Sequence, residues 1–233
     1  MARRRKKNQS KNSKMRHLIT KMNPRSPISE QYRTVRTNLE FSSADNELKS
    51  ILVTSSGPAE GKSSSVSNLA VVYAQQGKKV LLVDADMRKP TAHYTFRLDN
   101  LTGLSNILVG ETPLQEAVSF TDVENLDVIA CGPIPPNPSE LLGSKRMGQF
   151  MKEAKMSYDV ILFDTPPVLA VPDAQILANI CDGSLLVVRS KQTEYESAEK
   201  AIGVLQSQTA KFLGTILNDV EKKKANYYYY YGA

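Results

Sequence analysis

The sequence predicts an α/β protein in which helices flank both faces of a mostly parallel β-sheet. From residue 50 onward, short apolar segments of strand character alternate with longer segments whose apolar residues recur at helical spacing. Such alternation is typical of a parallel sheet, because a helix makes each crossover between neighbouring strands. The 233 residues, 41% of them hydrophobic, can bury one substantial core. We therefore expect one α/β domain, with two smaller domains as the alternative.

The N-terminal residues 1–25 are expected to form a basic, disordered arm. Residues 1–16 contain eight Lys or Arg side chains and no acid, and subtracting these eight from the net charge of +6 leaves −2 for the rest of the chain. A segment with few apolar residues and one sign of charge does not bury enough surface to fold. The arm could meet anionic lipid, nucleic acid or an acidic partner, or act only as a solubilising tail. For the protein as a whole we expect no nucleic-acid partner.

A helix is expected to follow the arm, with Ser26 as its cap and Pro27 as its first residue. Four apolar residues at helical spacing are predicted to face the domain: Ile28, Tyr32, Val35 and Leu39. Three charged residues are left together on another face: Glu30, Arg33 and Arg36. These charges could pair within the helix or reach a neighbouring subunit.

Six apolar segments are predicted to be the strands of the sheet: 49–56, 78–86, 126–130, 158–165, 184–190 and 212–217. The helices among them are expected at 61–77, 139–156, 174–181 and 195–208. The segment "GPIPPNPSELL", residues 132–142, reads as a stiff Pro-rich loop that ends in Ser139 as a helix cap. In such a sheet the ligand site lies outside the carboxyl ends of the strands.

The first candidate site is the loop "SSGPAEGKSSS" between the first strand and the next helix. A phosphate-binding loop needs small residues whose backbone N–H groups converge on phosphate, a lysine for the outer phosphates and a hydroxyl for Mg²⁺. Gly57, Gly61, Lys62 and Ser63 provide these groups, although Ser56 occupies the first glycine position of the strict pattern. The sequence therefore predicts a P-loop NTPase fold that binds a nucleotide.

Three acids lie where two of the apolar strands end. Asp84 and Asp86 are two residues apart at the end of the second strand, and Asp164 ends the strand in "DVILFDTPP". Because side chains i and i+2 of a strand share a face, Asp84 and Asp86 could point into one site. Asp164 occupies the usual place of the acid that holds Mg²⁺ through water in phosphate-loop enzymes.

These motifs resemble those of the bacterial tyrosine kinases of the polysaccharide-associated type, which use Walker motifs instead of the eukaryotic kinase fold. "SSGPAEGKS" resembles the phosphate loop of that family, "LLVDADMR" its second acidic motif and "VILFDTPP" its third. "EQYRTVR" resembles the motif through which the family assembles rings, and the run Tyr227 to Tyr231 resembles its autophosphorylated tail. The resemblance covers the chain from about residue 26 to the C-terminus and implies a fold like that of the partition and division ATPases.

The resemblance implies a role for individual residues. The catalytic residues would be Asp84 as the base, Lys62 and Asp86. ATP would be bound through six residues of the loop: Gly57, Glu60, Gly61, Lys62, Ser63 and Ser64. Mg²⁺ would be held by three oxygen donors: Ser63, Asp86 and Asp164. The ring would be assembled through Glu30, Arg33 and Arg36, and a neighbouring copy would phosphorylate Tyr227, Tyr228, Tyr229, Tyr230 and Tyr231.

The resemblance also implies an organisation of the chain and its partners. Residues 26–219 would be the kinase domain and residues 220–233 a flexible tail. The kinase would be activated by the cytoplasmic segment of a membrane-anchored protein, would serve capsular or exopolysaccharide synthesis or export, and would be reset by a phosphatase. It would also act on other protein substrates. No apolar run reaches the roughly 18 residues of a membrane span, so we expect a cytoplasmic protein recruited to the membrane by its activator.

Two other functions fit much of the same pattern. Partition and division-site ATPases share the fold and the Asp-x-Asp stretch, but their additional loop lysine would fall at Gly57, and they have no reason to end in five tyrosines. A catalytically weak scaffold that only senses ATP would show every motif unchanged. The tail itself could instead form an edge strand or an aggregation-prone patch. The two cysteines, Cys131 and Cys181, lack redox or metal-ligand spacing and are expected to be buried.

Overall fold

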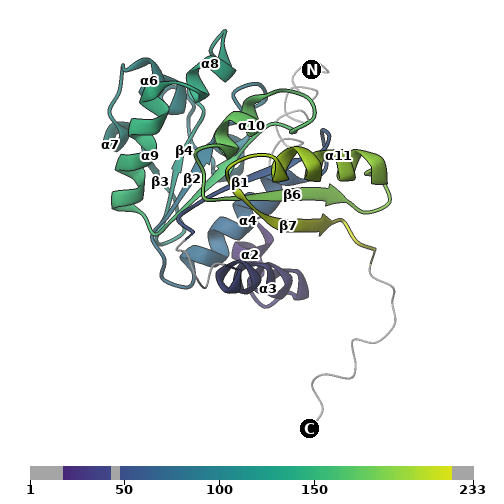
Figure 1. Ribbon diagram of the computed structural model, residues 1–233. Coiled ribbons are helices and arrows are strands. Elements are labelled where there is room, and N and C mark those ends of the chain that lie inside the picture. The colour runs from purple at the N-terminus through teal and green to yellow at the C-terminus, as the bar shows by residue number, and fades with distance from the viewer. Residues whose placement is uncertain (1–17, 43–47, 222–233) are drawn as a thin grey trace, which may run out of the picture.

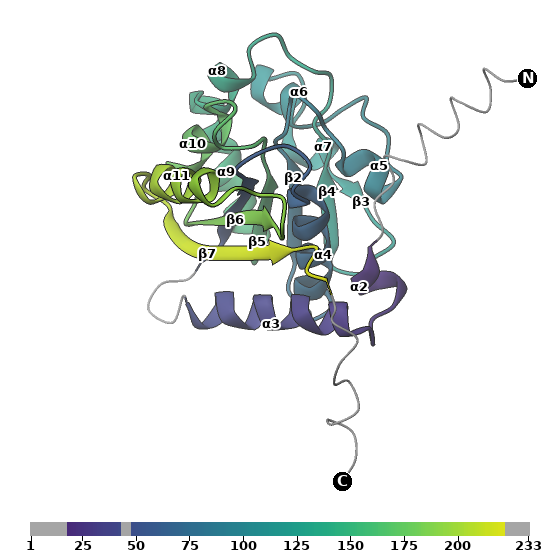
Figure 2. The same cartoon turned by 90° about the vertical axis from the view of Figure 1, so that its right-hand side faces the viewer.

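The computed structural model describes residues 18–42 and 48–221 and shows a seven-stranded sheet between two layers of helices (Figures 1 and 2). The tail tyrosines and residues 1–17 of the predicted arm lie outside the described residues. The strands are β1 (Ser50–Ser55), β2 (Val80–Asp84), β3 (Ser119–Phe120), β4 (Leu126–Ile129), β5 (Val160–Asp164), β6 (Gly183–Arg189) and β7 (Lys211–Asn218). All six expected strands are present, and only the short β3 is not predicted by the sequence.

The strand order is β3-β4-β2-β5-β1-β6-β7. All neighbouring strands are parallel except β3 and β4, so the predicted fold class is confirmed. The strands that precede the candidate site are central neighbours, because β5 lies between β1 and β2. Asp84 and Asp164 are direct partners in the register of β2 and β5. Since parallel strands end at the same edge, the topology places the phosphate loop beside the acids.

Two layers of helices bury the two faces of the sheet (Figures 1 and 2). One face is covered by α2 (Ile19–Met22), α3 (Pro27–Phe41), α4 (Lys62–Ala74) and α5 (Ala92–Phe96). The other is covered by α6 (Leu104–Val109), α7 (Leu114–Ala117), α8 (Pro138–Leu142), α9 (Lys145–Ser157), α10 (Asp173–Ala178) and α11 (Tyr195–Gln206). α4 is buried on nearly every side because it packs between the sheet and α3.

The single helix expected at 139–156 is two helices. α8 ends at Leu142, and α9 starts after Ser144, whose hydroxyl accepts the Met147 N–H at 3.3 Å and so caps the new helix. The prediction of Ser139 as a cap is wrong, because α8 begins one residue earlier at Pro138 and Asn137 occupies the cap position. The hydroxyl of Ser139 is thereby free to bond elsewhere, as described below.

The folded part of the chain begins before the predicted boundary at residue 26. Leu18 is only 7% exposed, and the hydroxyl of Thr20, in α2, donates to the Asn68 side chain at 2.8 Å. The predicted arm of 1–25 is therefore too long at its C-terminal end, because these residues pack against α4. Among the described residues, no helix is long and apolar enough to cross a membrane. Both cysteines are buried, as predicted.

α3 starts as predicted, with the Ser26 hydroxyl accepting the N–H of Ser29 at 3.1 Å. The prediction that its apolar residues face the domain is confirmed for Leu39, which is 4% exposed, and is wrong for Ile28, which is 40% exposed. Ser29 takes the inward position instead, because its hydroxyl donates to the Asn23 carbonyl at 2.8 Å.

The three charged residues of α3 do not share one free face. Glu30 and Arg33 form an ion pair one turn apart. Arg36 is turned onto α4, where its Nη1 donates to the carbonyl of Val72 at 2.8 Å. All three residues are predicted to assemble a ring, but Arg36 differs from the other two because it bonds α3 to α4 within the same chain.

Candidate active site

The loop between β1 and α4 follows a central strand and opens a buried helix. Ala59 and Gly61 both take a left-handed conformation, with φ of 64° and 96°. The left-handed conformation favours glycine at position 61, and a side chain there would also displace the Asn218 amide, which it would meet at 2.0 Å. The free N–H groups at the start of α4 face the space beyond the loop, which is the arrangement that binds phosphate.

Glu60 supports this loop from within. Its carboxylate accepts hydrogen bonds from the Ser56 N–H (2.9 Å), the Ser56 hydroxyl (2.7 Å) and the Thr193 hydroxyl (2.7 Å). Its carbonyl accepts from the side-chain amide of Asn218, the last residue of β7, at 3.0 Å. Glu60 therefore sets the shape of the loop, and its carboxylate is taken up by bonds to Ser56 and Thr193.

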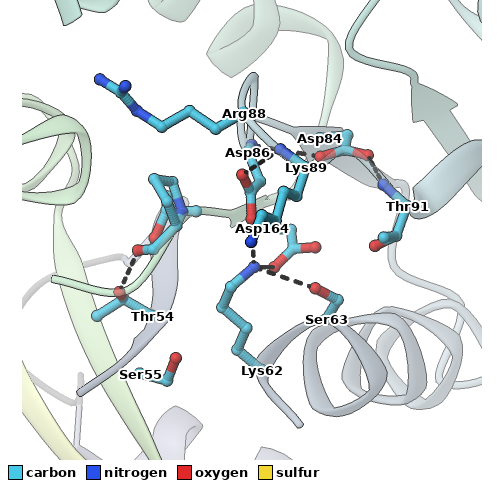
Figure 3. A network of polar contacts seen from close by, with 12 residues as sticks. Thr54, Ser55, Lys62, Ser63, Asp84, Asp86, Arg88, Lys89, Thr91 and Asp164 are labelled. Carbon is cyan, nitrogen blue, oxygen red and sulfur yellow. Dashed lines mark hydrogen bonds and ion pairs between the residues drawn. The ribbon is translucent and has the colours of Figure 1, made fainter. Parts of the chain in front are cut away.

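Lys62 lies between Asp86, which follows β2, and Asp164, which ends β5 (Figure 3). Its Nζ atom is 2.8 Å from Asp86 Oδ2, 3.3 Å from Asp164 Oδ1 and 3.2 Å from the Ser63 hydroxyl. The side chains of Lys62, Asp86 and Asp164 are only 12%, 7% and 2% exposed. Burial alone would lower the pKa of Lys62, but the charges of Asp164 and Asp86 outweigh it and raise this pKa. The structure thus brings four of the predicted site residues into direct contact.

Asp84 has other partners. Its side chain is fully buried, and its Oδ2 atom accepts the N–H groups of Thr91 and Ala92, both at 2.8 Å. The expectation that Asp84 and Asp86 point the same way is wrong, because β2 ends at Asp84 and strand alternation does not continue to Asp86 (Figure 3). Burial, and then the charge of Asp164, raise the pKa of Asp84 to about 7.

A cavity of about 620 Å³ opens next to these residues. One wall is the loop: Pro58, Ala59, Gly61, Lys62 and Ser63. The remaining lining residues are Asp86, Arg88, Lys89, Pro90, Thr91, His93, Tyr94, Asn100, Ile134 and Pro167. Of the six residues predicted to bind ATP, Gly61, Lys62 and Ser63 line this cavity, whereas Gly57, Glu60 and Ser64 do not.

Known proteins share this sequence and geometry. A protein family described as an AAA domain matches residues 48–213. The tyrosine-protein kinase YwqD of Bacillus subtilis is 52% identical over 217 residues, which cover 93% of this chain and 92% of that protein. The kinase domain of the Escherichia coli tyrosine kinase ETK is 35% identical and has a TM-score of 0.86, covering 91% of this chain and 83% of that one. This chain belongs to the bacterial tyrosine kinase family.

The bacterial tyrosine kinase family shares its fold with the division ATPases. The septum site-determining protein MinD of Pyrococcus horikoshii, whose structure is a complex with Mg-ADP, is 25% identical and has a TM-score of 0.63, covering 72% of this chain and 69% of that one. The phosphate loop and this shared fold make the chain a nucleotide-binding protein. Its greater identity to the kinases confirms the resemblance that the motifs indicate.

Several residues of the kinase cavity are not predicted from the sequence. Asn100 lies in a stretch without helical or strand periodicity, yet its side chain pairs with both the N–H (2.9 Å) and the carbonyl (2.8 Å) of Gly132 and so ties down the Pro-rich loop. His93 and Tyr94 lie in the short helix α5, which the sequence does not signal. Arg88, in contrast, has a sequence signal although it is outside the predicted set, since it ends the motif "LLVDADMR".

Proposed function

We propose that this protein is an ATP- and Mg²⁺-dependent protein-tyrosine kinase that phosphorylates tyrosines 227–231 of a neighbouring copy. In this way it would regulate capsular or exopolysaccharide synthesis or export. The observation that carries the proposal is the contact of the Lys62 ammonium with Ser63, Asp86 and Asp164 beside the cavity. The names of the relatives, tyrosine-protein kinases, support the class of reaction.

ATP would bind with its phosphates at the loop between β1 and α4. The cavity volume of about 620 Å³ lies in the range typical of small-molecule sites. Lys62 would exchange its carboxylate partners for oxygens of the β- and γ-phosphates, and backbone N–H groups of the loop would bind phosphate oxygens. Gly57 and Glu60 would contribute through the shape of the loop, and Ser64 from the first turn of α4.

The oxygen donors beside Lys62 fit Mg²⁺. This ion prefers oxygen ligands and is usually held by one or two carboxylates together with substrate phosphates. Asp86, Asp164 and the Ser63 hydroxyl are such donors, and the described part of the chain has no cluster of three His, Cys, Asp or Glu that would hold a metal by itself. When bound, the ion would neutralise charge on the phosphates during transfer.

Transfer requires a base near the acceptor. The phenolic oxygen of tyrosine attacks the γ-phosphorus, the bond from this phosphorus to the ADP oxygen breaks, and the phenolic proton leaves. We assign the proton to Asp84, the base that the resemblance of the motif implies, and burial and the charge of Asp164 raise its pKa to about 7, which suits a group that takes up a proton at neutral pH. Oδ1 is the suitable atom, since Oδ2 accepts two short bonds from the backbone whereas Oδ1 accepts one at 3.3 Å from the Asp86 N–H.

The position of β7 bears on which copy phosphorylates which. Asn218 ends β7 beside the phosphate loop, and the nine residues from there to Tyr227 span at most about 30 Å. The tail is therefore long enough to reach the active site of its own chain. The proposed transfer of phosphate to a neighbouring copy depends on assembly into a ring. Glu30 and Arg33 would contribute to that ring from α3, together with Arg36.

The other partners are proposed from the resemblance of the motifs. A membrane-anchored activator would recruit the kinase through its cytoplasmic segment, a phosphatase would remove the phosphates, and other proteins would be substrates. Two alternatives remain distinct from this proposal. A partition-type ATPase would hydrolyse ATP without modifying tyrosine, and a scaffold that senses ATP would bind it without chemistry.

The test is to incubate the protein with Mg-ATP, with and without activator fragment, and to locate phosphate by mass spectrometry. We expect phosphate on residues 227–231, and we expect Asp84→Ala to abolish it while nucleotide binding persists. Undiminished phosphorylation in Asp84→Ala would remove that residue from catalysis. Nucleotide binding by the wild type without any tyrosine phosphate would instead favour the alternatives.

The route is tested by mixing two full-length variants. One is Asp164→Asn with its tail intact, and the other is active but has phenylalanine at positions 227–231. Phosphate on the Asp164→Asn chain is the expected result. Labelling only of chains that carry both a working site and tyrosines would rule out transfer between copies.

A further inference from the structure

Three side chains from three separate segments meet beside the cavity. Arg88 follows β2, Ser139 lies in α8 within the Pro-rich segment, and Asp173 is the first residue of α10. Nε and Nη2 of Arg88 donate to the two carboxylate oxygens of Asp173, each at 3.0 Å. The Ser139 hydroxyl donates to Asp173 Oδ1 at 2.7 Å and accepts from Arg88 Nη2 at 3.2 Å. We call these three residues the clamp.

The acid of the clamp is buried and its guanidinium is partly exposed. The side chain of Asp173 is 0% exposed and that of Arg88 is 39% exposed. A buried carboxylate is costly unless it is paired and hydrogen-bonded, and Asp173 meets both conditions through Arg88 and Ser139. The planar fork of arginine matches the two oxygens of a carboxylate, which an ammonium group does not. The clamp therefore fixes the direction of the Arg88 guanidinium.

Of the clamp residues, Arg88 lines the cavity, on a part of its wall away from the phosphate loop. Arg88 lines the cavity together with Lys89, Ile134 and Pro167, and Ile134 is 61% exposed. The Arg88 side chain extends away from the contact between Lys62 and its acids (Figure 3). Because the phosphates belong on the loop side, this second wall lies apart from the proposed phosphate site.

We propose that Asp173 and Ser139 are positioning residues for the tyrosine acceptor. They hold Arg88 and the Pro-rich segment as the wall against which a tyrosine-bearing segment binds, an inference that rests on the proposed kinase function. An exposed aliphatic side chain in the same cavity as two cations, Arg88 and Lys89, suits a phenol ring, which takes both apolar and cation–π contacts. The prolines of residues 132–142 limit the motion of that segment, and Ser139 ties it to α10 and to Arg88.

The test separates acceptor binding from nucleotide binding. Full-length wild type, Asp173→Asn, Ser139→Ala and Arg88→Lys are assayed with Mg-ATP and a synthetic peptide of residues 222–233 as the acceptor. For Asp173→Asn and Arg88→Lys we expect the acceptor KM to rise at least about five-fold, with kcat and the Kd for Mg-ATP changed less than about two-fold. Ser139→Ala should show a smaller rise in the same constant, because it removes one hydrogen bond of the clamp.

Two controls distinguish this role from general destabilisation. Ser139→Thr keeps the hydroxyl and should restore the wild-type acceptor KM. Asp182→Asn removes a carboxylate that is likewise bonded to a cation, Lys155, but lies at the amino ends of the strands, away from the cavity. This substitution should leave the acceptor KM unchanged. If Asp173→Asn does not fold, the comparison of Ser139→Ala with Ser139→Thr decides the question.

The outcomes are distinct. An acceptor KM that stays at the wild-type value in Arg88→Lys and Ser139→Ala, or a Kd for Mg-ATP that rises as much as the acceptor KM, overturns the positioning role and leaves the kinase function standing. Failure of the wild type to phosphorylate any tyrosine overturns the kinase function, and this inference with it.

Discussion

Replacing Lys62 by methionine should destabilise the fold as well as stop catalysis. The ammonium group of Lys62 lies within 2.8 Å of Asp86 and 3.3 Å of Asp164, and these acids are 7% and 2% exposed. Removing one partner from a buried ion pair costs about 3–5 kcal/mol, because the remaining charge stays buried without compensation. Each kcal/mol shifts the Tm of a domain of this size by about 2–4 °C, so we expect a fall of roughly 6–20 °C.

Thermal unfolding followed by far-UV circular dichroism is the suitable assay, because the chain has no tryptophan. The buffer should contain neither Mg²⁺ nor nucleotide, since Mg²⁺ would bind the acids that Lys62 now neutralises and the phosphates of a nucleotide would bind Lys62 itself. Lys62→Met/Asp164→Asn removes one uncompensated charge and should recover part of the loss, whereas Lys89→Met, at an exposed lysine of the same cavity, should matter little. A Lys62→Met protein that melts within about 2 °C of the wild type would refute the reasoning.

Asp182→Asn should lower stability at pH 7 by about 1 kcal/mol, because the carboxylate accepts from the Lys155 ammonium at 2.7 Å in a partly exposed pair. Burial opposes the ionised form, but Lys155 and neighbouring donors lower the pKa of Asp182, so the stabilisation is present above about pH 4 and is lost as the pH falls through the lowered folded value. The free energies of unfolding in urea should therefore differ between the wild type and Asp182→Asn at pH 7 and become equal in acid. Replacing Glu30 and Arg33 together by alanine should leave the chain folded but reduce the mass of the assembly measured by light scattering. Arg36→Ala should also lower the Tm, because α3 loses a hydrogen bond to α4. An unchanged mass in the double variant would exclude the Glu30–Arg33 face from the assembly.

The sequence predicts the sheet well because its strands are short, continuous apolar runs. Such runs are required where both faces of a strand are buried, and the six that were predicted are all present. The phosphate loop is equally visible, since glycine, lysine and serine at fixed spacing have a direct chemical reason. The short helices α5 and α6 are not predicted, because their five and six residues show little periodicity.

The directions of side chains at the site are less visible in the sequence. Strand alternation predicts a common direction for Asp84 and Asp86, but the strand ends between them and the following turn bonds to Asp84. The partners of Asp173 are 34 and 85 residues away in the chain, so no local pattern indicates the clamp. At Asp84 and Asp86 the alternation rule fails because the strand ends earlier than the apolar run suggests, and at Asp173 local rules fail because contacts that are distant in sequence determine its position.

The end of β7 next to the phosphate loop has a kinetic consequence. A chain of nine residues from Asn218 keeps Tyr227 within about 30 Å of the loop to which Asn218 is bonded. Confinement at that range corresponds to an effective concentration on the order of millimolar, far above the concentration of a second molecule in dilute solution. A neighbouring tail therefore competes successfully only if assembly raises its own local concentration to a similar level. The rate per molecule should then fall on dilution at the concentration where the assembly dissociates, whereas a reaction within one chain would be indifferent to dilution.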